Sequence, residues 1–209
     1  MTEPARFMKP EEKGLNRILA LSDGVFAFAI TLLVLDLVVP TFGPNQGSSA
    51  LANVLAGEWN SFFNYFLSFT MIAAWWNTHQ RYFEYVNSYD GRLKVLNLLA
   101  LLTITLIPFF TKLLDSWNSA PLATVLYAVN QGVTGMFLGL ILRYASKNHR
   151  FIDERLDQRI INRMQITSVI PPVFFFFSIP LAFIEPAAAW TSWYAIFPIS
   201  YILRRKYSR

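Results

Sequence analysis

The feature that most constrains this chain is a series of apolar stretches, most of them close to the about 20 residues that an α-helix needs to cross a bilayer. A soluble domain of 209 residues could not bury so much apolar surface, since 54% of the residues are hydrophobic and 15% are charged. An open sheet cannot satisfy its backbone in lipid, so helices are favoured. The sequence therefore predicts an all-α integral membrane protein with six transmembrane helices, near residues 17–39, 58–80, 91–113, 121–144, 164–184 and 187–203.

The positions of Lys and Arg predict the orientation of these helices. If both termini are cytoplasmic, 17 of the 18 basic residues lie on the inner side, and Lys112 alone lies outside. Such an asymmetry is typical of the positive-inside rule. Residues 1–16 then form a cytoplasmic segment, 17–203 one transmembrane domain, and 204–209 a basic cytoplasmic tail. The excess of basic residues indicates contact with anionic lipids rather than with nucleic acid, because it follows the helix ends and no recognition motif is present.

The first apolar segment, RILALSDGVFAFAITLLVLDLVV (17–39), carries polar residues at particular positions. At about 100° per residue, Phe28, Thr31 and Leu35 form a stripe that is rotated by roughly 80–140° from Asp23. The helix therefore has one face with a carboxylate and a second face that is apolar except for one hydroxyl.

Asp23 needs partners on neighbouring helices, because an unpaired carboxylate at this depth is costly. Several polar side chains are predicted at the same depth, near the inner ends of the first three helices, and Trp76 is one of them. We expect a buried polar network that determines how these helices pack. Its predicted members are Arg17, Ser22, Asp23, Trp75, His79 and Asn97. A proton relay through Asp23 and His79 is the alternative interpretation.

The run Arg17-x-x-x-Leu-Ser-Asp23 resembles the R-x-x-x-F-S-D signature of the endosomal/lysosomal potassium channel family (transmembrane protein 175 type), with Leu21 in place of the usual Phe. A Trp-x-x-x-His spacing in the second helix and an Asn followed by Pro-Phe in the third are similar to this family as well. These residues are Trp75, His79, Phe83, Asn97, Pro108 and Phe109. The last three helices resemble the family only in their hydropathy and number.

The resemblance implies a potassium-permeable cation channel of the bacterial inner membrane that lacks a TVGYG filter and needs no cofactor. A bacterial chain with a single repeat is expected to form a homotetramer whose first helices line a central pore. The implied pore-lining residues are Phe28, Thr31, Leu35 and Val38, with the potassium path at Thr31. Apolar rings can block ions by dewetting, and a ring of hydroxyls can replace part of a hydration shell. We therefore expect passive flux of monovalent cations with a modest preference for potassium over sodium.

Other functional classes are less consistent with the sequence. It contains no HExxH, GxSxG, Walker or dinucleotide-binding pattern, so we do not expect an enzyme. A secondary transporter would usually show internal repeats, broken helices and charges at the midplane, whereas the first helix is uninterrupted. A transporter, a proton-permeable channel that uses Asp23 and His79, and a non-conducting helical scaffold remain the alternatives.

Overall fold

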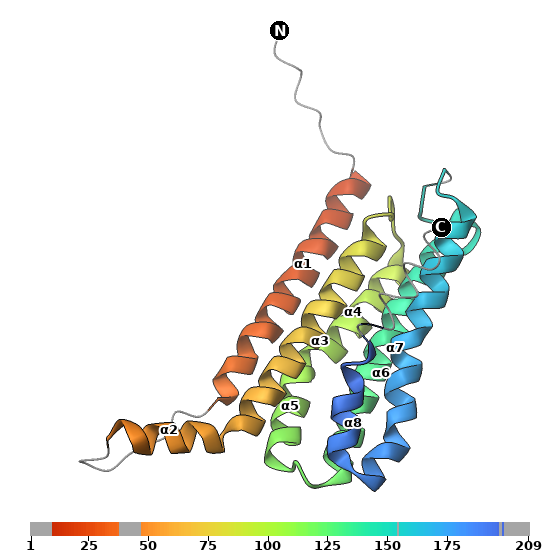
Figure 1. Ribbon diagram of the computed structural model, residues 1–209. Coiled ribbons are helices and arrows are strands. Elements are labelled where there is room, and N and C mark those ends of the chain that lie inside the picture. Colours follow the sequence, from red (N-terminus) through yellow and green to blue (C-terminus); the bar gives the residue numbers. More distant parts are fainter. Residues whose placement is uncertain (1–9, 38–46, 154, 197, 199–209) are drawn as a thin grey trace.

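Helices run the length of the structure, and the start of α1 marks one end of the bundle (Figure 1). We call this the N-terminal end and the opposite one the far end. The computed structural model describes residues 10–37, 47–153, 155–196 and 198. The helical elements are α1 (Pro10–Leu32), η1 (Leu33–Asp36), α2 (Ser48–Gly57), α3 (Trp59–Phe83), α4 (Gly91–Thr105), α5 (Ile107–Ser116), α6 (Pro121–Ser146), η2 (Lys147–His149), α7 (Gln158–Ile184) and α8 (Pro186–Trp193).

Four helical stretches among the described residues are long and apolar enough to cross a membrane. They are Lys13–Asp36, Gly91–Ser116, Pro121–His149 and Gln158–Ile184. These stretches correspond to the first, third, fourth and fifth predicted spans. Helix α3 coincides with the second predicted span but carries more polar residues, and α8 covers the start of the sixth. The prediction of an all-α membrane protein is confirmed.

Two predicted boundaries differ from the structure for local reasons. The third predicted helix is divided at Leu106 into α4 and α5, because Pro108 has no N–H to donate to the carbonyl of Ile104. Helix α7 begins at Gln158, before the predicted residue 164, because the Asp157 carboxylate accepts a hydrogen bond from the Arg159 backbone N–H (2.8 Å) and caps the helix there.

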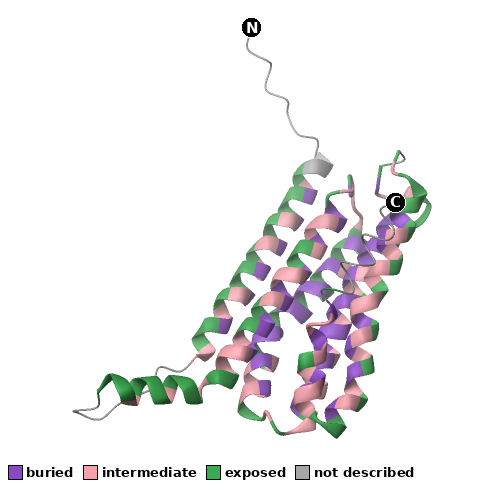
Figure 2. Ribbon diagram, viewed as in Figure 1, coloured by how far each residue is buried: buried purple, intermediate pink, exposed green. Residues whose placement is uncertain are grey.

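Helix α2 was absent from the sequence-based prediction. It projects sideways from the far end of the bundle (Figure 1), and none of its residues is buried (Figure 2). The helix is only 10 residues long, and α3, which follows it directly, is the helix that it contacts among the described residues.

Helix α6 is the most central helix of the bundle, since it contacts α3, α4, α5, α7 and α8. Gly135 allows α3 and α7 to approach it closely. A Cβ atom at this position would lie 2.7 Å from Cγ of Pro172 and 2.9 Å from Cη2 of Trp75. A larger residue would therefore push α3 and α7 away from α6.

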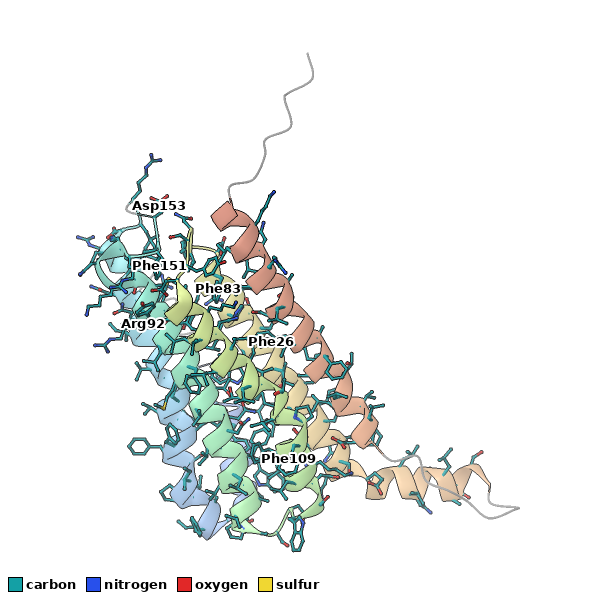
Figure 3. The ribbon with its side chains drawn as sticks, turned by 180° about the vertical axis from the view of Figure 1, so that it is seen from behind. Phe26, Phe83, Arg92, Phe109, Phe151 and Asp153 are labelled. Atoms are coloured by element: carbon teal, nitrogen blue, oxygen red, sulfur yellow. The ribbon has the colours of Figure 1, made fainter. Side chains whose placement is uncertain are left out.

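The segment between α6 and α7 folds back on the turn between α3 and α4. The Asn87 backbone N–H donates to the carbonyl of Phe151 (2.8 Å), and the Tyr144 hydroxyl donates to Asp90 Oδ2 (2.6 Å). Phe151 lies close to the N-terminal end, as Figure 3 shows. The bond from Tyr144 is the main reason that the pKa of Asp90 is lowered. This end of the bundle is therefore held by contacts outside the apolar spans.

Candidate functional site

The two faces of α1 have opposite environments. One face packs against α3, α4 and α5, and Figure 2 shows it as the buried side of the helix. Ser22 is fully buried there, Phe26 is 2% exposed, and Leu33, the first residue of η1, is 1% exposed on the same side. This face attaches the helix to its own protomer.

The opposite face of α1 contacts no other helix of the protomer in the described part of the chain. Six of the exposed residues recur at alternating spacings of three and four, although Lys13, Asn16, Ala20, Ala27 and Val34 are exposed as well. The six are Arg17, Leu21, Gly24, Phe28 and Thr31 of α1 and Leu35 of η1, which continues α1. Phe28 is 62% exposed and Leu35 is 75% exposed, although both belong to a stretch apolar enough to lie in lipid. We call these six residues the exposed stripe; it contains three of the predicted pore-lining residues, while Val38 lies outside the described residues.

Thr31 is an exposed residue of this stripe. Its hydroxyl donates to the carbonyl of Phe28 (2.8 Å), so the proton is used within the helix. The hydroxyl oxygen keeps its lone pairs, because a hydroxyl is one donor and two acceptors. The bond to the helix backbone, common for Thr in helices, therefore leaves Thr31 able to act as an acceptor toward a cation.

Behind α1, a chain of hydrogen bonds joins three helices. His79 Nε2 lies 2.8 Å from Asn97 Oδ1, Asn97 Nδ2 donates to Ser22 Oγ (3.0 Å), and the Ser22 hydroxyl donates to the carbonyl of Ile18 (2.9 Å). The direction of this chain makes His79 Nε2 the donor to Asn97. All three side chains are at most 1% exposed. The structure thus brings Ser22, His79 and Asn97 together, as the sequence analysis proposed.

The ring of His79 is enclosed by aromatic side chains. It stacks on Phe83 with 4.4 Å between ring centroids and lies 5.5 Å from Phe26; both phenylalanines are labelled in Figure 3. His79 Nδ1 is buried and has no hydrogen-bond partner among the described residues. A proton on Nδ1 would be a buried donor without an acceptor, so this environment favours the neutral ring.

Asp23 belongs to a separate group on the flank of α1. Trp76 Nε1 donates to Asp23 Oδ1 (3.0 Å), and Gln80 Nε2 donates to the same oxygen. Asp23 is half-buried and Trp76 is 44% exposed. Asp23 and His79 share no hydrogen bond in the described structure, so a relay between them would need a further group.

The remaining members of the predicted network lie elsewhere. Trp75 Nε1 donates to Gln131 Oε1 on α6 (2.6 Å), away from Asp23. Arg17 is exposed and pairs with no described acidic residue. Trp75 and Trp76 are consecutive on α3, so they point about 100° apart and cannot both reach one carboxylate.

Sequence reasoning missed Gln80 and Gln131. Gln80 could have been found, because it follows Trp76 by four residues and shares its helix face. Gln131 carries no such local signal, since only the packing of α6 against α3 places it beside Trp75. The described residues contain no group of three or more His, Cys, Asp or Glu side chains placed to hold a metal ion.

The sequence and the helical fold of this chain are similar to those of known proteins. A family model described as endosomal/lysosomal potassium channel TMEM175 matches residues 17–108. A potassium channel of Chamaesiphon minutus is 30% identical over 179 residues, which are 84% of this chain and 88% of that protein. The mouse endosomal/lysosomal proton channel TMEM175 is 25% identical over 182 residues, 81% of this chain and 36% of the mouse protein.

A solved structure agrees with these similarities. The crystal structure of a lysosomal potassium-selective channel TMEM175 homolog from Chamaesiphon minutus superimposes with a TM-score of 0.73 at 25% sequence identity, covering 94% of this chain and 100% of that one. The chain belongs to the TMEM175 family. It is therefore a multi-pass membrane protein of an ion-channel family, and the prediction that it is not an enzyme is confirmed.

Proposed function

We propose that this protein is a potassium-permeable cation channel that assembles as a homotetramer, with the exposed stripe of α1 lining a central pore. The observation that carries the proposal is that this stripe remains uncovered in the protomer although it lies in an apolar span. Family membership supports the same function, because the relative from Chamaesiphon minutus is named a potassium channel.

The spacing of the stripe supports contact between copies of α1. Alternation of three and four residues is the pattern of left-handed packing between parallel or antiparallel helices. Gly24 lies in this stripe, and a Cβ atom there would meet nothing within 4 Å in the protomer. A small residue at such a position lets helices of neighbouring copies approach closely in a membrane. The proposed number of copies, four, comes from the family resemblance.

The pore chemistry follows from the exposed residues. Phe28 and Leu35 would form apolar rings on either side of Thr31, and such rings exclude water and ions when they close. The Thr31 ring offers neutral oxygens whose protons are already bonded to the helix. Neutral oxygens replace part of a hydration shell but do not hold an ion tightly, so we propose a modest preference for potassium over sodium.

The hydrogen-bond chain behind α1 gives the pore helix a fixed rotation. Ser22 is buried against Asn97, so the opposite face of the same helix must point away from the protomer. The cluster of Ser22, His79 and Asn97 is therefore proposed to act structurally rather than on the ion.

Proton permeation is the second candidate, because the mouse relative is named a proton channel. A relay through Asp23 and His79 would require a connection between them, and each has its own partners in the protomer. Proton flux through the central pore would instead depend on the stripe. Substitution of Asp23 or His79 should abolish proton flux through the relay. Substitution in the exposed stripe should instead abolish proton flux through the central pore.

The proposed orientation places both termini in the cytoplasm. The N-terminal end of the bundle carries basic residues such as Arg92 and Arg150, whereas Lys112 lies at the far end, on α5. The basic end is expected to contact anionic lipids of the inner leaflet.

The experiment that tests the function uses purified protein in liposomes, with gradients of potassium, sodium, caesium or protons imposed in turn. We expect passive potassium flux, weaker sodium flux, and a particle mass of a tetramer in detergent. Thr31→Val should reduce the preference for potassium, and Thr31→Ser should retain it. A monomeric particle that conducts, or saturable flux coupled to a counter-ion, would contradict the proposal.

A further inference from the structure

Two basic residues lie on the uncovered side of α1, closer to the N-terminal end than any of the proposed pore residues. Lys13 and Arg17 are both exposed, and Arg17 belongs to the exposed stripe. Neither of them forms a hydrogen bond or an ion pair with any residue that the structure describes. Their two charges are therefore not neutralised by contacts within the described protomer.

The helical period places these charges in line with the proposed potassium path. Lys13 and Thr31 both belong to α1 and are 18 residues apart. Eighteen residues are five full turns at 3.6 residues per turn, so both residues lie on the same side of the helix axis. Arg17 lies within about 40° of this line at 100° per residue. If Thr31 faces a central pore, Lys13 and Arg17 face the same pore at a different depth.

The depth of these residues corresponds to the inner mouth of the proposed pore. At a rise of 1.5 Å per residue, Arg17 is about 21 Å and Lys13 about 27 Å from Thr31 along the helix axis. Each copy of the chain would contribute two positive charges at this depth. The positive-inside rule explains why basic residues lie at this end, but it does not require them on the uncovered face of α1.

The acidic residues of the same half of α1 lie at other angles around the helix axis. Glu11, Glu12 and Asp23 are about 120–140° from Arg17 at 100° per residue. Asp23 is held on the flank of α1 by Trp76. The basic line of α1 therefore has no acidic residue of its own helix beside Arg17.

We propose that Arg17 and Lys13 form a positively charged ring at the cytoplasmic mouth of the pore, which limits the flow of potassium out of the cell. This inference rests on the proposed tetrameric channel. A charged ring at a pore mouth changes the local concentration of permeant ions, and a positive ring lowers that of cations. Potassium from the cytoplasm has to pass this ring before it reaches Thr31, whereas potassium from the far end does not. Inward current therefore exceeds outward current.

The test uses the full-length protein in inside-out membrane patches, in which the cytoplasmic face is known, with equal potassium chloride on both sides and no divalent cations. At about 10 mM salt we expect inward current to exceed outward current by roughly threefold, the scale of a few unit charges at about 10 Å in water. At about 1 M salt the ratio should approach one, because the Debye length falls from about 30 Å to about 3 Å.

Substitutions of Arg17 separate its charge from a structural role. Arg17→Gln should raise the outward current at low salt and bring the ratio closer to one, and Arg17→Lys should retain the wild-type ratio. Unfolding of Arg17→Gln should match the wild type, since Arg17 has no described partner. Arg143→Gln is the control, because Arg143 is exposed in the last turn of α6 at the same end, and its ratio should stay unchanged.

A single cysteine makes the test independent of the choice of substitution. The chain contains no cysteine, so Arg17→Cys provides one thiol for labelling. A thiol reagent that adds a positive group should restore the wild-type ratio, and one that adds a negative group should raise the outward current above the inward current. Absence of any current in the wild type contradicts the proposed channel. A conducting wild type with equal currents at low salt, or an unchanged ratio in Arg17→Gln, overturns this inference alone.

Discussion

The buried and exposed faces of α1 both carry large apolar side chains but differ in what covers them. Phe26 is 2% exposed and Phe28, two residues later, is 62% exposed. The buried face is held by its own protomer through packing and through the Ser22–Asn97 bond, whereas the exposed face has no partner in the described chain. A membrane helix can therefore pack one face within its own protomer while a second face remains available for assembly and function. Substitutions on the two faces should therefore affect different measurements.

The largest effect is expected from Leu33→Ala on the buried face. Leu33 is 1% exposed, so its truncation should lower the free energy of unfolding by about 2–5 kcal/mol through lost contacts and a cavity. The measurement is denaturant- or heat-induced unfolding of the purified protein in detergent. Leu35→Ala is the matched control, because Leu35 is 75% exposed. Equal stability of both variants would remove the distinction between the faces.

The next effect concerns the hydrogen-bond chain behind α1. His79→Ala leaves Asn97 Oδ1 without its donor and should cost about 1–3 kcal/mol of unfolding free energy. Asp23→Ala should cost less, because Asp23 and its partner Trp76 are partly exposed. If Asp23→Ala proves more destabilising than His79→Ala, Asp23 must gain partners from a neighbouring copy. Comparing the stability of the tetramer in the two variants tests whether it does.

Thr31→Val should change ion preference without changing the fold. The substitution keeps the shape and removes the oxygen, and we expect a loss of about 1 kcal/mol of discrimination, the scale of one neutral hydrogen bond. This corresponds to roughly a fivefold lower ratio of potassium to sodium permeability. Reversal potentials under bi-ionic conditions measure the ratio, with Thr31→Ser as the control that retains the hydroxyl. An unchanged ratio in assembled Thr31→Val tetramers would place the potassium path elsewhere.

Leu35→Ser is expected to have the smallest effect. A polar residue in an apolar ring favours wetting of the pore, so single-channel conductance should rise, by roughly twofold. Leu51→Ser on α2 is the control, since Leu51 is 43% exposed but lies outside the bundle. A rise in both variants would indicate a general change in the membrane surface rather than a wider pore.

Several parts of the structure were predictable from local pattern. Hydropathy located the long spans, and the heptad-like spacing of Phe28, Thr31 and Leu35 placed them on one face of α1. The polar residues at a common depth predicted that Ser22, His79 and Asn97 would meet. The division of the third span at Leu106 was also readable in principle, because Pro108 removes a helical donor.

The sequence by itself determined the long apolar helices and the position of each polar side chain along them, because these depend on local composition and helical period. Only the tertiary structure decided that Trp75 bonds Gln131 rather than Asp23, that Trp76 and Gln80 hold Asp23, and that Arg17 stays outside the cluster. It also decided which side of α1 is covered. Depth along a helix follows from counting residues, but the rotation of one helix against another depends on packing at close contacts such as Gly135.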